Sequence, residues 1–520
     1  MTTPTEEIVS ISSIFATNNS FQSVRDAPPQ ERKLTNLFFF LAFIVCLVLL
    51  LPFSVVFTTN NNMKRLLYGY DSCGNTCGVK NRPFYSVNCS GKDMSEKPIA
   101  MMKYQLTNPN CIFSMKKVFP DKCVEKCSPP NQLIFNRCYQ PETETSLDSR
   151  SKNFKQLIEI AHAICSSTST IFTMSFTGLV LSFGLFVCLR CHVGATFWGL
   201  TIFQSFMALT AVAFFWHKYI INDSDNSTAY LFLALGAMAY FAFIFIFFFV
   251  LHNTFAMIRR IYQEASNAIF GTPMILLQPL LTLTLLISIS VVIVFLAFLS
   301  LSTGCLKASY ENPSIYVHVT NPASLYYIAY LVFIILWIYS FGEGLQAMVV
   351  SGATQEFYNT RDKFLRNPIR KSFQTLLNYH LGTVACGSLL STIFVFMRGL
   401  AEYMNRKVYI LTAMKGESFY KSLKRAITLL RLNLLETAAI TGFNYLIISG
   451  FSFLIVIVTV GVGVWMNLNT EYTTNVRLGI LFGAISASFV SHFVLQVLHT
   501  TTETIFISFC EERLTTTPKK

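Results

Sequence analysis

Residues 231–250 read LFLALGAMAYFAFIFIFFFV, an apolar run without a charged side chain. A helix that crosses the hydrocarbon core of a bilayer needs about 20 mostly apolar residues, whereas a membrane β-strand alternates apolar and polar positions. Nine stretches of the chain have the helical character: 34–57, 168–189, 193–215, 230–252, 274–301, 325–350, 376–396, 441–465 and 478–498. The sequence therefore predicts an all-α polytopic membrane protein.

Composition agrees with this fold class, because 52% of the 520 residues are hydrophobic and only 13% are charged. Soluble domains carry about 25% charged residues. The net charge of +13 comes from Lys and Arg dispersed through loops, beside no nucleic-acid-binding signature. We attribute this excess to membrane orientation and expect no nucleic-acid partner.

The N-terminal part of the chain indicates its orientation. Residues 1–33 are polar, and Arg32 and Lys33 directly precede the first apolar run. Positive charge marks the cytosolic side, so we predict a cytosolic tail at 1–33 and an uncleaved transmembrane helix at 34–57. The segment that follows is then outside the cell.

Residues 58–167 form the one large hydrophilic domain. It holds eight of the chain's 14 cysteines: Cys73, Cys77, Cys89, Cys111, Cys123, Cys127, Cys138 and Cys165. Such density predicts disulfides of undetermined connectivity in an extracellular domain. A zinc site is the rival use of the paired cysteines, but hardly any histidine accompanies them. Acceptor sequons at Asn88, Asn222 and Asn226 predict glycosylation on the same side.

The remaining chain predicts a transmembrane bundle at 168–500 and a cytosolic tail at 501–520. The loops on both sides of 376–396 are rich in basic residues, which indicates that both are cytosolic. This conflicts with a single full crossing at 376–396, because one crossing cannot join two cytosolic loops. Either 376–396 is re-entrant, or a further polar crossing lies within 403–435. We prefer about ten crossings, with an amphipathic cytosolic segment at 398–431 that braces the membrane surface or gates the inner mouth.

Several segments carry recognisable motifs. Residues 67–78, LYGYDSCGNTCG, resemble the motif after the first span of the choline transporter-like family of solute carriers, and 378–389, NYHLGTVACGSL, are similar to that family's Tyr-His-Leu-Gly signature. Val408 and Glu417 depart from its pattern. The resemblance implies a plasma-membrane, sodium-independent carrier of choline or a related amine such as ethanolamine, coupled in some members to protons.

A quaternary ammonium donates no N–H hydrogen bond, so its site needs aromatic faces and a carboxylate. Glu343 lies deep in a span between two glycines and is the leading candidate, although a structural hydrogen bond explains it equally well. The other predicted substrate-binding residues are Trp337, Tyr339, Gln346, Tyr379 and Glu436. Interfacial positions are the alternative explanation for the aromatic residues and for Glu436.

Proton coupling needs a group that titrates near neutral pH, for which we predict His380 and Glu402. The alternative for Glu402 is a plain helical pair with Arg398, four residues earlier. Carrier sites are often lined by broken helices, and the predicted breaks are Pro273, Pro279, Gly382 and Gly387. For the prolines, the alternative is the first turn of a helix.

No catalytic motif of the usual hydrolase, nucleotide-binding or zinc-protease classes occurs in the chain, so we expect no enzyme, cofactor or metal. The predicted partners are a small amine and the lipid bilayer, and we favour a monomer. Two other functions remain open: a receptor or adhesion protein that binds a ligand through its Cys-rich domain, and a lipid scramblase.

Overall fold

The computed structural model describes residues 32–59, 63–83, 89–106, 116–129, 131–134, 136–139, 160, 162–221, 227–251, 254–309, 314–360, 367–468 and 474–516. Within them, seven helices are long and apolar enough to cross a membrane. They are α2 (Leu37–Thr59), α5 (Thr168–Ile221), α6 (Ser227–Leu251), α8 (Gln278–Ser302), α9 (Pro322–Asn359), α14 (Leu434–Met466) and α15 (Thr474–Thr516). Apolar runs fold this way because a helix satisfies its own backbone hydrogen bonds. The all-α polytopic fold is confirmed.

Helix α5 accounts for two predicted runs. It bends at His192, where φ is −148° and ψ is 76°, so that its two arms cover 168–189 and 193–215. In the first arm, Gly178 packs against Ala487 of α15. In the second arm, Gln204 accepts a hydrogen bond from Tyr240 of α6 and donates one to the Leu446 carbonyl of α14. The break at His192 therefore divides α5 into two helical arms, which correspond to the two predicted spans.

The run 376–396 does not form one long helix. It divides into a π-helical turn, η4 (Leu376–His380), helix α11 (Leu381–Ile393) and a 3₁₀ turn, η5 (Val395–Met397). The 13 residues of α11 rise about 20 Å, less than the roughly 30 Å of the hydrocarbon core. The run 376–396 is not among the seven candidate spans, and the re-entrant segment and the full crossing both stay predictions.

Helix α12 (Arg398–Lys415) returns along α11 as an antiparallel hairpin. The Asn405 amide donates to the Gly387 carbonyl at 2.6 Å and to the Ser391 hydroxyl at 2.8 Å. Helix α13 (Phe419–Leu432) follows after a break at Gly416. The predicted amphipathic segment 398–431 is thus two helices.

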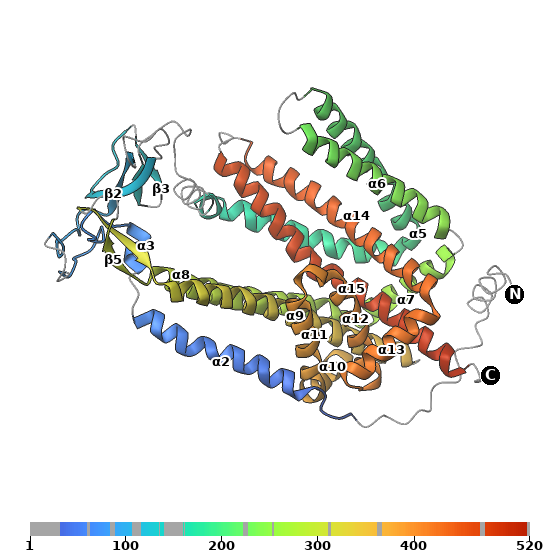
Figure 1. Cartoon of the computed structure of the whole chain (residues 1–520). Helices are drawn as coiled ribbons and strands as arrows, with labels where there is room; N and C mark the ends of the chain where they lie inside the picture. Colours follow the sequence, from blue (N-terminus) through green and yellow to red (C-terminus); the bar gives the residue numbers. More distant parts are fainter. Residues whose placement is uncertain are drawn as a thin grey trace.

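Figure 1 separates the two ends of the molecule. The β-strands and α3 (Met63–Tyr68) lie at one end, and the start of α2, the hairpin, α13 and α10 (Pro368–Thr375) lie at the other. Helix α15 also ends there, and it continues to Thr516 through most of the stretch that we predicted to be a tail. Thr501, Glu503 and Ile505 of this stretch are buried.

Two of the clusters of buried apolar residues define overlapping helix groups, which share α9 and α15. One cluster joins α5, α14 and α15 with the short helix α7 (Phe255–Gly271), which continues through a 3₁₀ turn, η3 (Pro273–Leu277), to α8. A second cluster joins α2, α8, α9 and α11. Phe493 of α15 belongs to the second cluster, so α9 and α15 form the junction between the groups.

The extracellular domain contains a four-stranded sheet in the order β2-β1-β4-β3. Its strands are β1 (Ile99–Leu106), β2 (Lys116–Val124), β3 (Gln132–Ile134) and β4 (Arg137–Tyr139). Strands β1 and β4 run parallel, and the other pairs run antiparallel.

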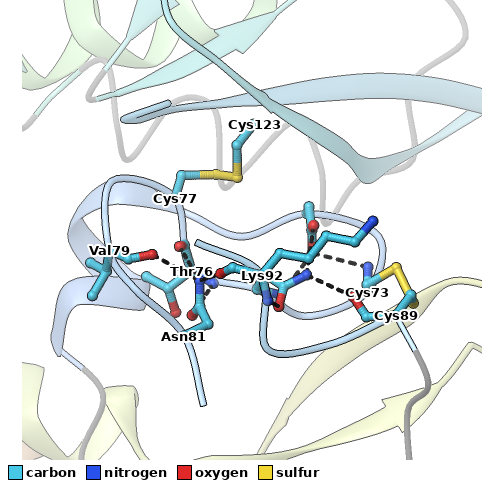
Figure 2. The surroundings of a disulfide bond; sticks show 10 residues. Cys73, Thr76, Cys77, Val79, Asn81, Cys89, Lys92 and Cys123 are labelled. Atoms are coloured by element: carbon cyan, nitrogen blue, oxygen red, sulfur yellow. Dashed lines mark hydrogen bonds between the residues drawn. A yellow bond between two sulfur atoms is a disulfide. The ribbon is translucent and has the colours of Figure 1, made fainter. Parts of the chain in front are cut away.

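Three disulfides hold the domain: Cys73–Cys89, Cys77–Cys123 and Cys127–Cys138. Figure 2 shows Asn81 beside two of them, where it accepts from the Thr76 amide and donates to the Val79 carbonyl. Cys165 differs from the prediction, because it is an exposed free thiol on the helical turn before α5. Cys111, Asn88, Asn222 and Asn226 lie outside the described residues.

A second small sheet connects this domain to the bundle. Strands β5 (Gly304–Ala308) and β6 (Tyr316–Thr320) form a hairpin between α8 and α9. The Tyr316 amide donates to the Ser72 carbonyl at 2.8 Å, and the His318 amide donates to the Tyr70 hydroxyl at 3.1 Å. The disulfide domain is therefore anchored to the two helices that lead towards the junction.

Candidate functional site

Glu343 lies where the two helix groups meet. Its Oε1 atom on α9 is 3.2 Å from Nε2 of His492 on α15. The Gln496 amide, one turn further along α15, lies 3.0 Å from the same ring nitrogen. A neutral His492 can accept from Gln496, whereas a protonated His492 donates to Glu343. The carboxylate and the imidazole therefore form one unit across the junction.

Arg398 adds a positive charge from the tip of the hairpin. Its guanidinium pairs with Glu402 one turn later, as the four-residue spacing predicted, and its carbon Cζ lies 5.3 Å from the centre of the Tyr339 ring. Glu343 also attracts it electrostatically. We call Tyr339, Glu343, Arg398, Glu402 and His492 together the junction site.

The charged side chains of the junction site are partly exposed. The exposed fraction of the side chain is 16% for Glu343, 44% for His492, 29% for Arg398 and 34% for Glu402. An ionised group that faces hydrocarbon costs roughly 2.5 kcal/mol or more, so groups of this kind normally line a hydrated cavity. With His492 neutral, two carboxylates face one guanidinium, and the site carries one net negative charge.

A recess continues from Glu343 along α15. It encloses about 180 Å³ of empty space and is lined by Glu343, Gln346, Ala347, Phe493, Gln496 and Thr500. The Gln346 amide nitrogen donates to the Phe493 carbonyl at 2.7 Å, while its Oε1 atom is buried and has no hydrogen-bond partner among the described residues. The recess therefore presents a carboxylate and, close by, an unused acceptor.

A second group of charges lies deeper between α12 and α15. Lys407 Nζ donates to Glu503 Oε1 at 3.0 Å, and the two side chains are only 5% and 3% exposed. His499 contacts both Glu503 and Arg406. We call Arg406, Lys407, His499 and Glu503 the buried ion-pair cluster. It fixes the hairpin to the last helix, because a buried charge is stable only beside its partner.

Two predicted substrate residues lie elsewhere. Trp337 is buried against Phe43 of α2 and Phe333, and its indole N–H donates to Ser388 of α11 at 3.1 Å. Glu436 occupies the first turn of α14, where a carboxylate is favoured by the helix dipole. Trp337 thus holds helices together, and Glu436 has a sufficient explanation as a helix-terminal charge.

Tyr379 and His380 contact the segment that precedes α2. The Thr35 amide donates to the Tyr379 carbonyl at 2.9 Å, and the Thr35 hydroxyl lies 3.0 Å from Nδ1 of His380. Burial and the nearby Arg32 guanidinium lower the pKa of His380 to about 4. His380 is therefore neutral at physiological pH and anchors the N-terminal segment.

The predicted helix breaks differ in kind. Pro273 starts the 3₁₀ turn η3, and Pro279 lies in the first turn of α8, so both prolines mark a helix start. Gly382 and Gly387 lie inside α11 and permit close contacts instead. A Cβ atom at Gly382 would overlap the Thr35 and Asn36 carbonyls, and one at Gly387 would overlap the Tyr409 hydroxyl. The irregular backbone is the π-helical turn just before them.

Sequence reasoning missed most of the residues around Glu343. His492, Gln496, His499 and Glu503 are spaced by four, three and four residues, which places them on one face of a helix. This polar stripe begins in the last apolar run and continues beyond it. We did not consider it in the sequence analysis, and we treated Arg398 only as the partner of Glu402.

Comparison with known proteins gives a consistent result. The model of a family described as plasma-membrane choline transporter matches residues 235–514. Choline transporter-like protein 1 of Torpedo marmorata is 26% identical, covering 94% of this chain and 90% of its own. Choline transporter-like protein 3 of Homo sapiens is 25% identical, covering 93% and 88%, and choline transporter-like protein 2 of Dictyostelium discoideum is 23% identical, covering 93% and 91%.

The family model covers more than half of the chain, including the junction site and the buried ion-pair cluster. The relatives extend over nearly the whole length, and the multi-pass helical fold is the one that a plasma-membrane transporter requires. This chain belongs to the plasma-membrane choline transporter family.

Proposed function

We propose that this protein carries choline or a related amine such as ethanolamine across the plasma membrane and binds the ammonium group at the junction site. The names of its relatives support choline as the substrate. The observation that carries the proposal is the net negative charge of a partly exposed site beside an aromatic face, where Glu343 and Glu402 outnumber Arg398.

The chemistry of choline matches the two parts of the site. Its ammonium group is attracted by carboxylates and by the face of Tyr339, and each cation–π contact contributes about 0.5–2 kcal/mol. Its hydroxyl group can donate to Oε1 of Gln346, which has no other donor among the described residues. Ethanolamine has the same hydroxyl group and a primary ammonium, so the same arrangement accepts it.

Transport requires the junction to open and close. The recess beside Glu343 has no room for a ligand in this conformation, whereas ligand pockets enclose about 300–1,000 Å³. The α9 group must therefore move away from the α15 group to admit substrate. Because Glu343 lies on α9 and His492 lies on α15, this movement also separates the carboxylate from the imidazole.

We assign proton coupling to His492. Protonation of His492 neutralises the net charge of the site, so that a proton and a substrate cation compete for Glu343. The other charged groups nearby, Arg398 and Glu402, compensate each other. The low pKa of His380 removes it from the physiological range. Sodium independence is carried over from the resemblance to the family.

The test is uptake of radiolabelled choline into proteoliposomes containing the purified protein. We expect saturable uptake by the wild type, a KM that is higher by roughly 10- to 100-fold in Glu343→Gln, and little change in the control Glu436→Gln. Ethanolamine should compete with choline, replacement of Na⁺ should leave the rate unchanged, and an outward proton gradient should alter it only while His492 is present.

Four results would overturn the proposal. Equal transport by Glu343→Gln would show that the junction site does not bind substrate. Loss of uptake in Glu436→Gln alone would place the substrate site at the start of α14 instead. Absence of uptake at every pH, with a ligand bound to the extracellular domain, would support a receptor. Dithionite quenching of inner-leaflet labelled lipid in the same vesicles would support a scramblase.

A further inference from the structure

Arg398 already occupies the kind of place that the substrate cation needs. Its guanidinium faces the Tyr339 ring at 5.3 Å and is attracted by Glu402 and Glu343. An aromatic face with carboxylates around it is also the environment that holds a quaternary ammonium. The same groups cannot hold both cations at full strength.

The local structure gives no other reason for an arginine at this position. Arg398 is the first residue of α12, where the partial positive charge of the helix terminus disfavours a cation. Its pair with Glu402 also has the weaker orientation, because an acidic residue four positions before a basic one is the favourable order. The site at Tyr339 therefore compensates for a position that the helix itself makes unfavourable.

We propose that Arg398 is a tethered substitute for the substrate's ammonium group. Substrate displaces the guanidinium from the Tyr339 face, and the guanidinium returns when substrate leaves. This inference rests on the proposed function and specifies how the junction site works. The side chain is 29% exposed and follows the 3₁₀ turn Val395–Met397, so it has space to swing away while it stays close to Glu402.

A tethered cation has a consequence for the transport cycle. In the empty site Arg398 balances one of the two carboxylates, so only one net negative charge opposes reorientation of the empty carrier through the membrane. Without Arg398, the empty site holds uncompensated carboxylates that oppose closure in a low-dielectric environment. Such a carrier returns only when it is loaded, so it exchanges substrate but accumulates little.

The first experiment measures net choline uptake and choline–choline exchange by Arg398→Gln in proteoliposomes. We expect the KM for exchange to fall by about fivefold, which corresponds to the free energy of one cation–π contact. Net uptake should fall at least about tenfold while exchange continues. Arg425→Gln is the matched control, because Arg425 pairs with Glu511 far from the junction site, and it should not change either quantity.

Methylguanidinium is the second probe. If Arg398 vacates an actual binding place, methylguanidinium should inhibit choline exchange competitively in Arg398→Ala, and more strongly than K⁺ at the same concentration. Equal inhibition by the two ions would mean that the arginine acts only through its general field. An unchanged or raised KM in Arg398→Gln would overturn the inference while the wild type continues to transport choline.

The wild-type protein supplies a test that is independent of how the variants fold. Phenylglyoxal modification of arginine, mapped by mass spectrometry, should increase at Arg398 when choline is added, and it should stay constant at Arg425. Unchanged modification or protection of Arg398 by choline would contradict displacement. Failure of the proposed function is recognisable separately, because the wild type would then neither bind nor exchange choline.

Discussion

The contact between Lys407 and Glu503 gives the sharpest stability prediction. At 3.0 Å and an effective dielectric constant near 20, the two charges attract by about 5 kcal/mol, which is largely offset by the cost of removing both from water. The pair adds little net stability, but either charge alone is very costly. We expect Glu503→Gln to destabilise the protein by about 3–5 kcal/mol, because it leaves the ammonium of Lys407 buried without its partner.

The assay is thermal unfolding of the purified protein in detergent, followed by intrinsic fluorescence. The double variant Lys407→Met with Glu503→Gln should recover most of the loss, since no buried charge then remains unpaired. Lys371→Met is the control: its pair with Glu356 is comparably close, but Lys371 is 67% exposed, so the loss should be at most about 1 kcal/mol.

The unfolding transitions of Glu503→Gln, Lys371→Met and the double variant together can contradict this reasoning. If Lys371→Met and Glu503→Gln lower the unfolding temperature equally, burial does not determine the cost of an unpaired charge here. If the double variant is as unstable as Glu503→Gln, the damage comes from lost packing or from His499, and the account of the buried ion-pair cluster is wrong.

Three further predictions concern other parts of the molecule. Cys77→Ser removes a disulfide between residues 46 positions apart, so it should lower the free energy of unfolding by about 2–5 kcal/mol and reduce delivery to the cell surface. Cys165 is a free thiol, so Cys165→Ser should have little effect. Surface biotinylation compares the two variants, and an equal loss of surface protein would contradict the assignment of the disulfide. Gly382→Ala should detach the N-terminal segment, because the new methyl group overlaps the Thr35 carbonyl; faster proteolysis before α2 is the expected readout, and unchanged cleavage would oppose it. Burial and the nearby Arg32 lower the pKa of His380 to about 4 in the folded protein, so the stability that depends on a neutral His380 is complete above pH 6.5 and is lost as the pH falls towards 4. His380→Asn should flatten that decline in unfolding temperature, and identical pH profiles would refute the effect of burial on His380.

Much of the fold could be predicted because a membrane helix is recorded locally in the sequence. Each apolar run must satisfy its own backbone hydrogen bonds, so its composition and length suffice to identify it, as they did for α2, α6 and α8. The density of cysteines likewise predicted an oxidised domain, and three disulfides occur there. The carboxylate of Glu343 was recognisable for the same reason, because a charge within a span must have a partner or water.

The partners themselves depend on contacts between residues that are distant in the chain, and only the tertiary structure decided them. His492 reaches Glu343 across 149 residues, and Lys407 reaches Glu503 across 96. Composition also could not distinguish a full crossing from the hairpin of α11 and α12. A crossing and a hairpin are both apolar where they enter the bundle, and they differ in where the first helix stops, which is at Ile393 in this protein. Local hydrophobicity determines which segments enter the membrane, whereas side-chain packing between helices determines which charges meet there.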